Sequence, residues 1–188
     1  GAAMSNNASS FPYKGWKGNQ YEGGIKTPMI MTWKNKIKSN IEFNGFISSL
    51  DIFKTSLENA GVDESLIKNA DGKNILNSLK ANMPLNQDLF WRKDKMATVR
   101  SGNYKLIRLN DSSTVLYNIN KNFFEDYDLK YENPLMHDSL LNKLDNWEKK
   151  LIKPNWIENK NWNIVTEMIY QDLMNNEEIR AYSPKDLN

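Results

Sequence analysis

Apolar positions between residues 48 and 62 repeat every three or four residues, which predicts a helix with one apolar face. The repeating positions are Leu50, Phe53, Leu57 and Ala60. Ser48 or Ser49 can cap the start of this helix, because a serine side chain accepts a hydrogen bond from a free backbone amide, and Gly61 can end it. The apolar run from Ile25 to Trp33 instead predicts a largely buried strand, with Pro28 at its start or at an edge.

The second half of the chain changes to short apolar runs separated by turns. Residues 89 to 119 predict a small antiparallel sheet, with a hairpin at the Gly-Asn pair that begins at Gly102. The next segment predicts a helix that covers this sheet with one apolar face, formed by Leu140, Leu141, Leu144, Trp147 and Leu151. One more helix is expected over about Ile164 to Ile179.

Composition narrows the class of protein. The chain has 188 residues, 39% of them hydrophobic and 26% charged, which is typical of a folded globular protein. The net charge is only +2, whereas a nucleic-acid-binding protein typically has a strong excess of positive charge. With no cysteine and one histidine, disulfides, thiolate nucleophiles and most zinc sites are excluded. No apolar run reaches the roughly 20 residues of a membrane span, and no signal peptide is visible, although a longer precursor can carry one.

The most unusual stretch is a glycine-rich loop that contains Lys17, "YKGWKGNQYEGGIKTP" from Tyr13 to Pro28. Glycines allow close backbone approach and positive φ, so backbone amides can join a lysine ammonium in holding an anion. On residue types alone, however, a lysine in such a loop is more often solvated and without function. The loop is not a Walker loop, because no Lys-Ser or Lys-Thr pair follows at the required spacing.

Several segments in sequence, from the lysine loop through "SSLDIFKTSLENAGV", "DGKNIL", "LFWR" and "ATVRSGNYKLIRL" to "VLYNI", resemble the C-terminal part of formylglycine-dependent sulfatases of the alkaline-phosphatase-like superfamily. The resemblance covers residues 12 to 150. It implies an α/β fold: the C-terminal end of a sulfatase catalytic domain in residues 1–87, a small antiparallel sheet covered by a helix in residues 88–152, and a helical tail in residues 153–188.

The resemblance also assigns a site residue. The family's loop lysine contacts the sulfate of the substrate, and Lys17 is the matching position. Glu22, Gly23 and Gly24 match the accompanying turn, for which a structural role is favoured, and Lys14 is left unassigned.

Other parts of the family's site have no match in this chain. The nucleophile is a formylglycine made in a Cys/Ser-x-Pro-x-Arg motif, and a divalent cation, expected to be Ca²⁺, is held mainly by aspartates of the N-terminal half. Ser10 has Ser-x-Pro spacing, but the motif ends in Lys14 and lies in the wrong place. Gly1 is taken as the glycine that follows the family's last metal-binding Asp-Asn pair. On this interpretation the N-terminal catalytic half is missing, the chain alone is inactive, and residues 1 to 35 are loosely packed.

The implied function is hydrolysis of sulfate esters of carbohydrates or polysaccharides by a periplasmic or secreted enzyme. One alternative is a phosphate or phosphonate ester hydrolase on the same scaffold. Another is a non-catalytic carbohydrate-binding module that stacks sugars on Trp156 and Trp162, which are otherwise docking anchors. Arg92 and Arg100 are expected in structural ion pairs, and His137 on the protein surface.

Overall fold

The computed structural model describes residues 2–3, 6, 8–110 and 112–187, so Gly1 lies outside the described residues. The chain forms two compact units, one of residues 1–27 with 88–188 and one of residues 28–87. This division differs from the boundaries expected from the sequence, because the lysine loop and the tail both belong to the unit that contains the sheet. No helix among the described residues is long and apolar enough to cross a membrane.

The first unit is built on a four-stranded antiparallel sheet with strand order β1-β2-β3-β4. Its strands are β1 (Asp88–Lys93), β2 (Met96–Ser101), β3 (Tyr104–Leu109) and β4 (Ser113–Asn118). The predicted sheet and hairpin are therefore confirmed. Gly102 has φ 55°, a conformation that glycine adopts without steric cost, and this allows the two-residue turn between β2 and β3.

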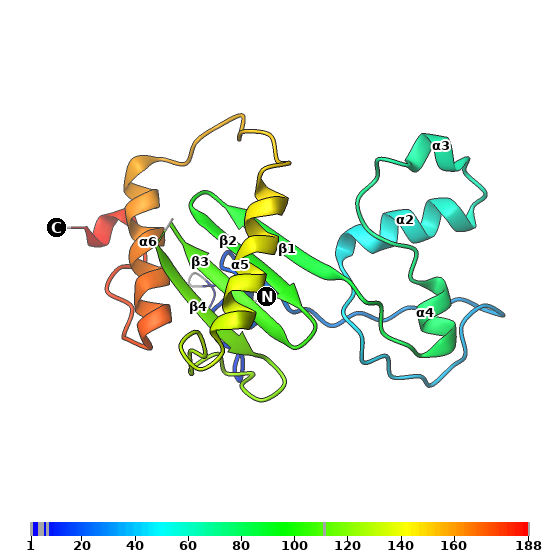
Figure 1. Cartoon of the computed structure of the whole chain (residues 1–188), viewed down its shortest axis with the longest axis horizontal. Helices are drawn as coiled ribbons and strands as arrows, with labels where there is room; N and C mark the ends of the chain where they lie inside the picture. The colour runs from blue at the N-terminus through cyan, green and yellow to red at the C-terminus, as the bar shows by residue number, and fades with distance from the viewer. Residues whose placement is uncertain (1, 4–5, 7, 111, 188) are drawn as a thin grey trace. The chain divides into compact units, whose positions relative to one another are not determined.

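Helix α5 (Pro134–Glu148) covers one face of the sheet, as predicted, and Figure 1 shows it lying across the strands. Leu140 and Leu144 are the buried residues of the helix. They pack against apolar side chains on this face of the sheet, to which every second residue of a strand points. These side chains are Ala97, Val99, Leu106 and Leu116. Asn133 caps the helix by accepting a hydrogen bond from the amide of Met136.

The opposite face of the sheet is covered by segments from both ends of the chain. Helix α6 (Lys160–Asn175) contributes its buried residues Val165, Ile169, Tyr170 and Leu173. Tyr21 is fully buried in the same cluster, and Trp16 and Leu187 pack against it. The sequence predicted one covering helix and a separate tail, whereas both faces of the sheet are covered.

Two expectations for the N-terminal region are wrong. Residues 26–33 form no strand, and only a short helix, α1 (Glu22–Ile25), precedes them. Pro28 has no amide hydrogen to donate, and Ile30 is 93% exposed instead of buried. Residues 19–22 are not loosely packed, because each is buried against the sheet unit.

The second unit contains α2 (Ser49–Asn59), α3 (Glu64–Ile67) and α4 (Leu76–Ala81). Helix α2 begins as predicted, with Ser48 and Asp51 forming a capping box. Its buried residues, however, are the polar Asp51 and Thr55, while Leu50 and Phe53 of the predicted apolar face are 53% and 57% exposed. The helix was therefore predicted correctly, but the face that it buries was not.

Candidate functional site

The lysine loop folds back on α1 through close backbone contacts. The amide of Gly23 donates to the carbonyl of Lys14 at 2.8 Å. A Cβ on Gly23 would lie 2.6 Å from that oxygen, and a Cβ on Gly24 would lie 2.2 Å from the carbonyl of Asn19. Only glycine fits at these two positions, which explains the Gly-Gly pair after Glu22. Ser10 takes part in the same packing by donating its hydroxyl to the carbonyl of Gly23 at 3.0 Å.

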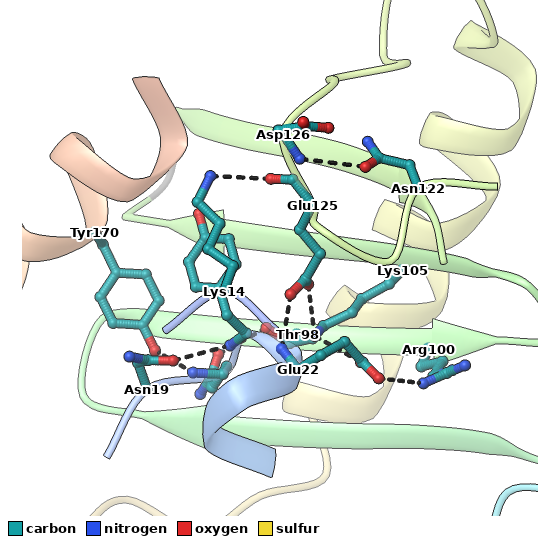
Figure 2. A network of polar contacts seen from close by, with 12 residues as sticks. Lys14, Asn19, Glu22, Thr98, Arg100, Lys105, Asn122, Glu125, Asp126 and Tyr170 are labelled. Atoms are coloured by element: carbon teal, nitrogen blue, oxygen red, sulfur yellow. Dashed lines mark hydrogen bonds and ion pairs between the residues drawn. The ribbon is translucent and has the colours of Figure 1, made fainter. Parts of the chain in front are cut away.

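Glu22 fixes the loop to the sheet through a buried ion cluster (Figure 2). Its carboxylate accepts hydrogen bonds from Arg100 on β2 and Lys105 on β3, each at 3.0 Å. Lys105 also pairs with Glu125 at 2.8 Å, and the carboxylate of Glu125 accepts the amide of Glu22 at 2.7 Å. Glu22, Lys105 and Glu125 are each at most 1% exposed. Each buried charge therefore has an opposite partner, which offsets the cost of removing it from water.

The pKa values of the two carboxylates in this cluster are shifted in opposite directions. Burial alone would raise the pKa of Glu22, but Lys105 and Arg100 keep it below its ordinary value. Burial raises the pKa of Glu125, and Lys105 only partly opposes this effect. Glu22 is therefore the more strongly stabilised anion. The expected structural roles of Glu22 and Arg100 are confirmed by these contacts.

Lys14, which the sequence left unassigned, joins the loop to two distant segments. Its ammonium donates to the carbonyl of Glu125 at 2.9 Å and to the side-chain oxygen of Asn176 at 2.6 Å. Burial lowers its pKa to about 8, although the nearby acidic groups of Glu125 and Asp126 oppose the shift. The Lys14 ammonium therefore donates its hydrogen bonds to other residues of the folded chain. Glu125 itself has φ 55°, an uncommon conformation for a non-glycine residue, and this places its carbonyl within reach of Lys14.

Lys17 lies on the outer side of this fixed loop. Its backbone amide donates to the carbonyl of Ala2 at 2.8 Å, and the preceding residue, Trp16, packs against the core. Its side chain is exposed, and none of the residues that the structure describes forms an ion pair or hydrogen bond with its ammonium. A cation on a rigid loop with no internal partner is available to bind an anion from solution.

The structure separates the other predicted residues from Lys17. His137 bonds to Thr114 at 2.9 Å on the α5 face of the sheet, the face opposite to the lysine loop, and is not the surface histidine that was expected. Arg92 forms an ion pair with Glu148 at 3.7 Å, as expected. Trp156 and Trp162 are 82% and 42% exposed, so the first is not a docking anchor among the described residues.

The residues present do not fit the divalent cation that the family resemblance implies. Within residues 2–3, 6, 8–110 and 112–187, no group of three or more His, Asp or Glu side chains could hold a metal ion. The buried carboxylates of Glu22 and Glu125 are both paired with Lys105. Any ligands for the cation would have to come from elsewhere in a complete protein.

Sequence reasoning missed Lys105 and Glu125. A signal for Lys105 was present, because strand alternation places it on the same face as Ile107 and Leu109, where a lysine requires an acidic partner. Glu125 gave no such signal, since it lies in a turn outside any periodic element and 103 positions from Glu22.

Comparisons with known proteins find sulfatases among the relatives of this chain. A sulfatase from Formosa agariphila is 29% identical over 170 residues, which are 77% of this chain and 31% of the relative. N-acetylgalactosamine-6-sulfatase from Canis lupus familiaris is 28% identical over 105 residues, 55% of this chain and 20% of the relative. No family model matches the chain.

The crystal structure of Ps i-CgsB in complex with k-i-k-neocarrahexaose superposes with a TM-score of 0.75 at 22% identity, covering 92% of this chain and 40% of that one. This likeness shows the fold, and the match lies in the C-terminal portion of sulfatase structures. The chain thus spans about a third or less of the curated relatives described here. With a lysine loop fixed to a small antiparallel sheet and matches that extend over most of its length, this chain is similar to the C-terminal portion of sulfatases.

Proposed function

We propose that the complete protein hydrolyses sulfate esters of carbohydrates and that Lys17 contacts the sulfate group. The observation that carries this proposal is the position of Lys17, an exposed ammonium on a loop whose backbone is fixed by buried ion pairs and by Gly23 and Gly24. Similarity to sulfatases supports the reaction class, and N-acetylgalactosamine-6-sulfatase among the relatives supports a carbohydrate substrate.

The chemistry of the loop suits this role. Charge builds up on the sulfate oxygens and on the leaving oxygen as the ester bond breaks, and a fixed cation stabilises that charge more than it stabilises the ground state. The backbone of Lys17 needs little reorganisation, because the residues around it are held in place. Trp16 packs on the core, and the amide of Asn19 donates to the carbonyl of Trp16 at 3.1 Å.

The nucleophile and the cation are proposed to come from other parts of the complete protein. A formylglycine and a divalent cation, for which Ca²⁺ is the expected ion, would supply nucleophilic attack and charge neutralisation. The 188-residue chain on its own is therefore expected to show no turnover of sulfate esters. A periplasmic or secreted location is proposed on the basis of the family.

The test is replacement of Lys17 in the complete enzyme. We expect Lys17→Ala to lower kcat on a sulfate ester about 10²-fold, the loss typical for removal of one stabiliser of transition-state charge. Lys17→Arg keeps the positive charge and should recover part of this loss. Lys121→Ala is the matched control, since Lys121 is also an exposed lysine of the same unit.

Undiminished activity of the Lys17→Ala enzyme would remove Lys17 from the site. Steady-state kinetics on matched sulfate and phosphate esters separate the proposed reaction from a phosphate or phosphonate hydrolase on the same scaffold. Faster turnover of the phosphate ester would show that the substrate class is wrong while leaving the anion-binding role of Lys17 intact.

A further inference from the structure

A surface hollow of about 380 Å³ lies beside the lysine loop. Its volume falls in the range of small-ligand sites, roughly 300–1,000 Å³. Most of the side chains that line it are apolar or aromatic, and they include Ala2, Ala8, Phe11, Tyr13, Trp16 and Tyr182. Phe11 is 82% exposed and Tyr182 is 48% exposed, so two of its aromatic rings are free to contact a ligand.

The hollow brings together residues from both ends of the chain. Trp16 and Tyr182 have ring centroids 6.3 Å apart and planes inclined at 44°, so they form two walls that meet at an angle. Because Tyr182 lies far from the loop in sequence, no local pattern indicated that it would lie beside Trp16.

Tyr182 is held firmly by its neighbours. Its amide donates to the carboxylate of Asp186 at 2.8 Å, and the preceding Ala181 is 1% exposed. The tail before it is fixed by Arg180, whose guanidinium pairs with the buried Asp172 at 2.7 Å. The backbone at Tyr182 is therefore fixed by the folded tail before any ligand arrives.

The hollow lies next to Lys17, because two of its lining residues are connected to the backbone of Lys17. Trp16, one of its walls, directly precedes Lys17, and Ala2, another lining residue, accepts the amide of Lys17 at 2.8 Å. A ligand that reaches from the hollow to Lys17 must present an apolar surface and, next to it, an anionic group. A sulfated sugar has both, because the C–H face of a pyranose ring is apolar and the sulfate is charged.

We propose that this hollow binds a sugar ring of the sulfated carbohydrate substrate, with Tyr182 and Phe11 as the residues that select carbohydrate over simple sulfate esters. The proposal rests on the function proposed above and adds the surface that recognises the sugar. Aromatic rings suit this task, because they bury apolar area at a small cost in side-chain entropy.

The experiment measures binding and turnover separately in the complete enzyme. Titration calorimetry gives Kd for two probes, k-i-k-neocarrahexaose and a hexasaccharide of N-acetylgalactosamine 6-sulfate. We expect Tyr182→Ala to weaken the binding of the preferred probe about 3- to 10-fold, the range set by one aromatic contact. Phe11→Ala should act in the same direction, and Tyr182→Phe, which keeps the ring, should stay within about twofold of the unsubstituted enzyme.

Two controls make the result specific. Tyr131→Ala removes an aromatic side chain that is 86% exposed and lies outside the hollow, and it should leave Kd unchanged. In the Tyr182→Ala enzyme, KM should rise more for the oligosaccharide than for a small aryl sulfate, which has no sugar ring to contact Tyr182.

The proposal is overturned if Tyr182→Ala leaves Kd unchanged, if Tyr131→Ala causes the same loss, or if the unsubstituted enzyme binds neither probe. Failure of the proposed function is a different result. In that case sulfate esters are not hydrolysed or Lys17→Ala has no effect on turnover, while the calorimetric comparison of Tyr182 variants still reports on the hollow.

Discussion

Glu22 and Glu125 contact the same lysine, yet they contribute differently to the fold. Glu22 balances two cations, Arg100 and Lys105, and its pKa is held below its ordinary value. Glu125 shares Lys105 with Glu22, and burial raises its pKa. Neutral substitutions at the two positions should therefore have unequal effects on stability.

We expect Glu22→Gln to lower the free energy of unfolding by about 3–5 kcal/mol at pH 7, because it removes the buried carboxylate that pairs with both Arg100 and Lys105. Glu125→Gln should cost clearly less, since the amide oxygen can still accept the amide of Glu22 and an anion that is poorly stabilised is removed. Urea denaturation of both variants measures the difference. Equal losses would show that the charge of Glu22 has no special role.

The pH dependence distinguishes the two residues further. Because the folded pKa of Glu22 is lowered, its stabilising contribution is fully present above its ordinary pKa of 4.5 and is lost as the pH falls through the folded value. The folded pKa of Glu125 is raised, so its contribution is lost as the pH rises from 4.5 through the folded value. The destabilisation caused by Glu22→Gln should therefore shrink in acid.

At the scale of elements, helix α2 depends on a polar residue for its place in the second unit. Asp51 is fully buried; one carboxylate oxygen accepts the amide of Ser48 and the other accepts the amide of Lys73, each at 2.8 Å. The loop before Lys73 passes close to α2, where a Cβ on Gly72 would lie 2.4 Å from the carbonyl of Leu50. Asp51 thus caps α2 and also ties the loop to it.

Asp51→Ala should destabilise the protein by about 2–4 kcal/mol, since it removes the Asp51 half of the capping box and leaves two part-buried amides, of Ser48 and Lys73, without this acceptor. The matched control is Asp63→Ala, which removes the cap of α3 at an exposed position and should cost about 1 kcal/mol or less. Thermal unfolding followed by circular dichroism compares the two. A smaller loss for Asp51→Ala than for Asp63→Ala would contradict the double role of Asp51.

The elements that the sequence predicted well are those set by local chemistry. The capped helix at Ser48, the Gly102 turn and the face of α5 that contains Leu140 and Leu144 all depend on neighbouring residues. The strand expected at Ile25 to Trp33 failed because an apolar run becomes a strand only when another strand pairs with it. In the same way, the ion pairs that join Lys105 to Glu22 and Glu125 were not predicted, because they connect residues far apart in the chain.

At the scale of the whole molecule, the lysine loop is part of the core of the sheet unit. The amide of Gln20 donates to the hydroxyl of Tyr170 at 2.8 Å, and the amide of Gly24 donates to the carbonyl of Tyr21 at 2.8 Å. Hydrogen exchange should therefore show protection at residues 20 to 24 comparable to that of β3. Residues 29–33, which include the exposed Met29 and Ile30, should exchange fast.

Mass spectrometry of peptides that cover residues 13–25 and 28–36 makes this comparison directly. Fast exchange throughout residues 13–25 would contradict the packing of the loop against the sheet. The expectation drawn from the sequence was fast exchange over all of residues 1 to 35, so the experiment separates the two accounts.

The ion cluster also sets the order in which a newly made chain can mature. Residues 13–25 leave the ribosome before the sheet does, because the partners of Glu22 follow 78 positions later at Arg100 and 103 positions later at Glu125. Until then the carboxylate of Glu22 stays hydrated and the loop has no fixed shape, because burying it unpaired would be too costly. Lys17 is therefore positioned only after the sheet has been synthesised and folded, so an incompletely translated chain cannot present the loop in its final shape.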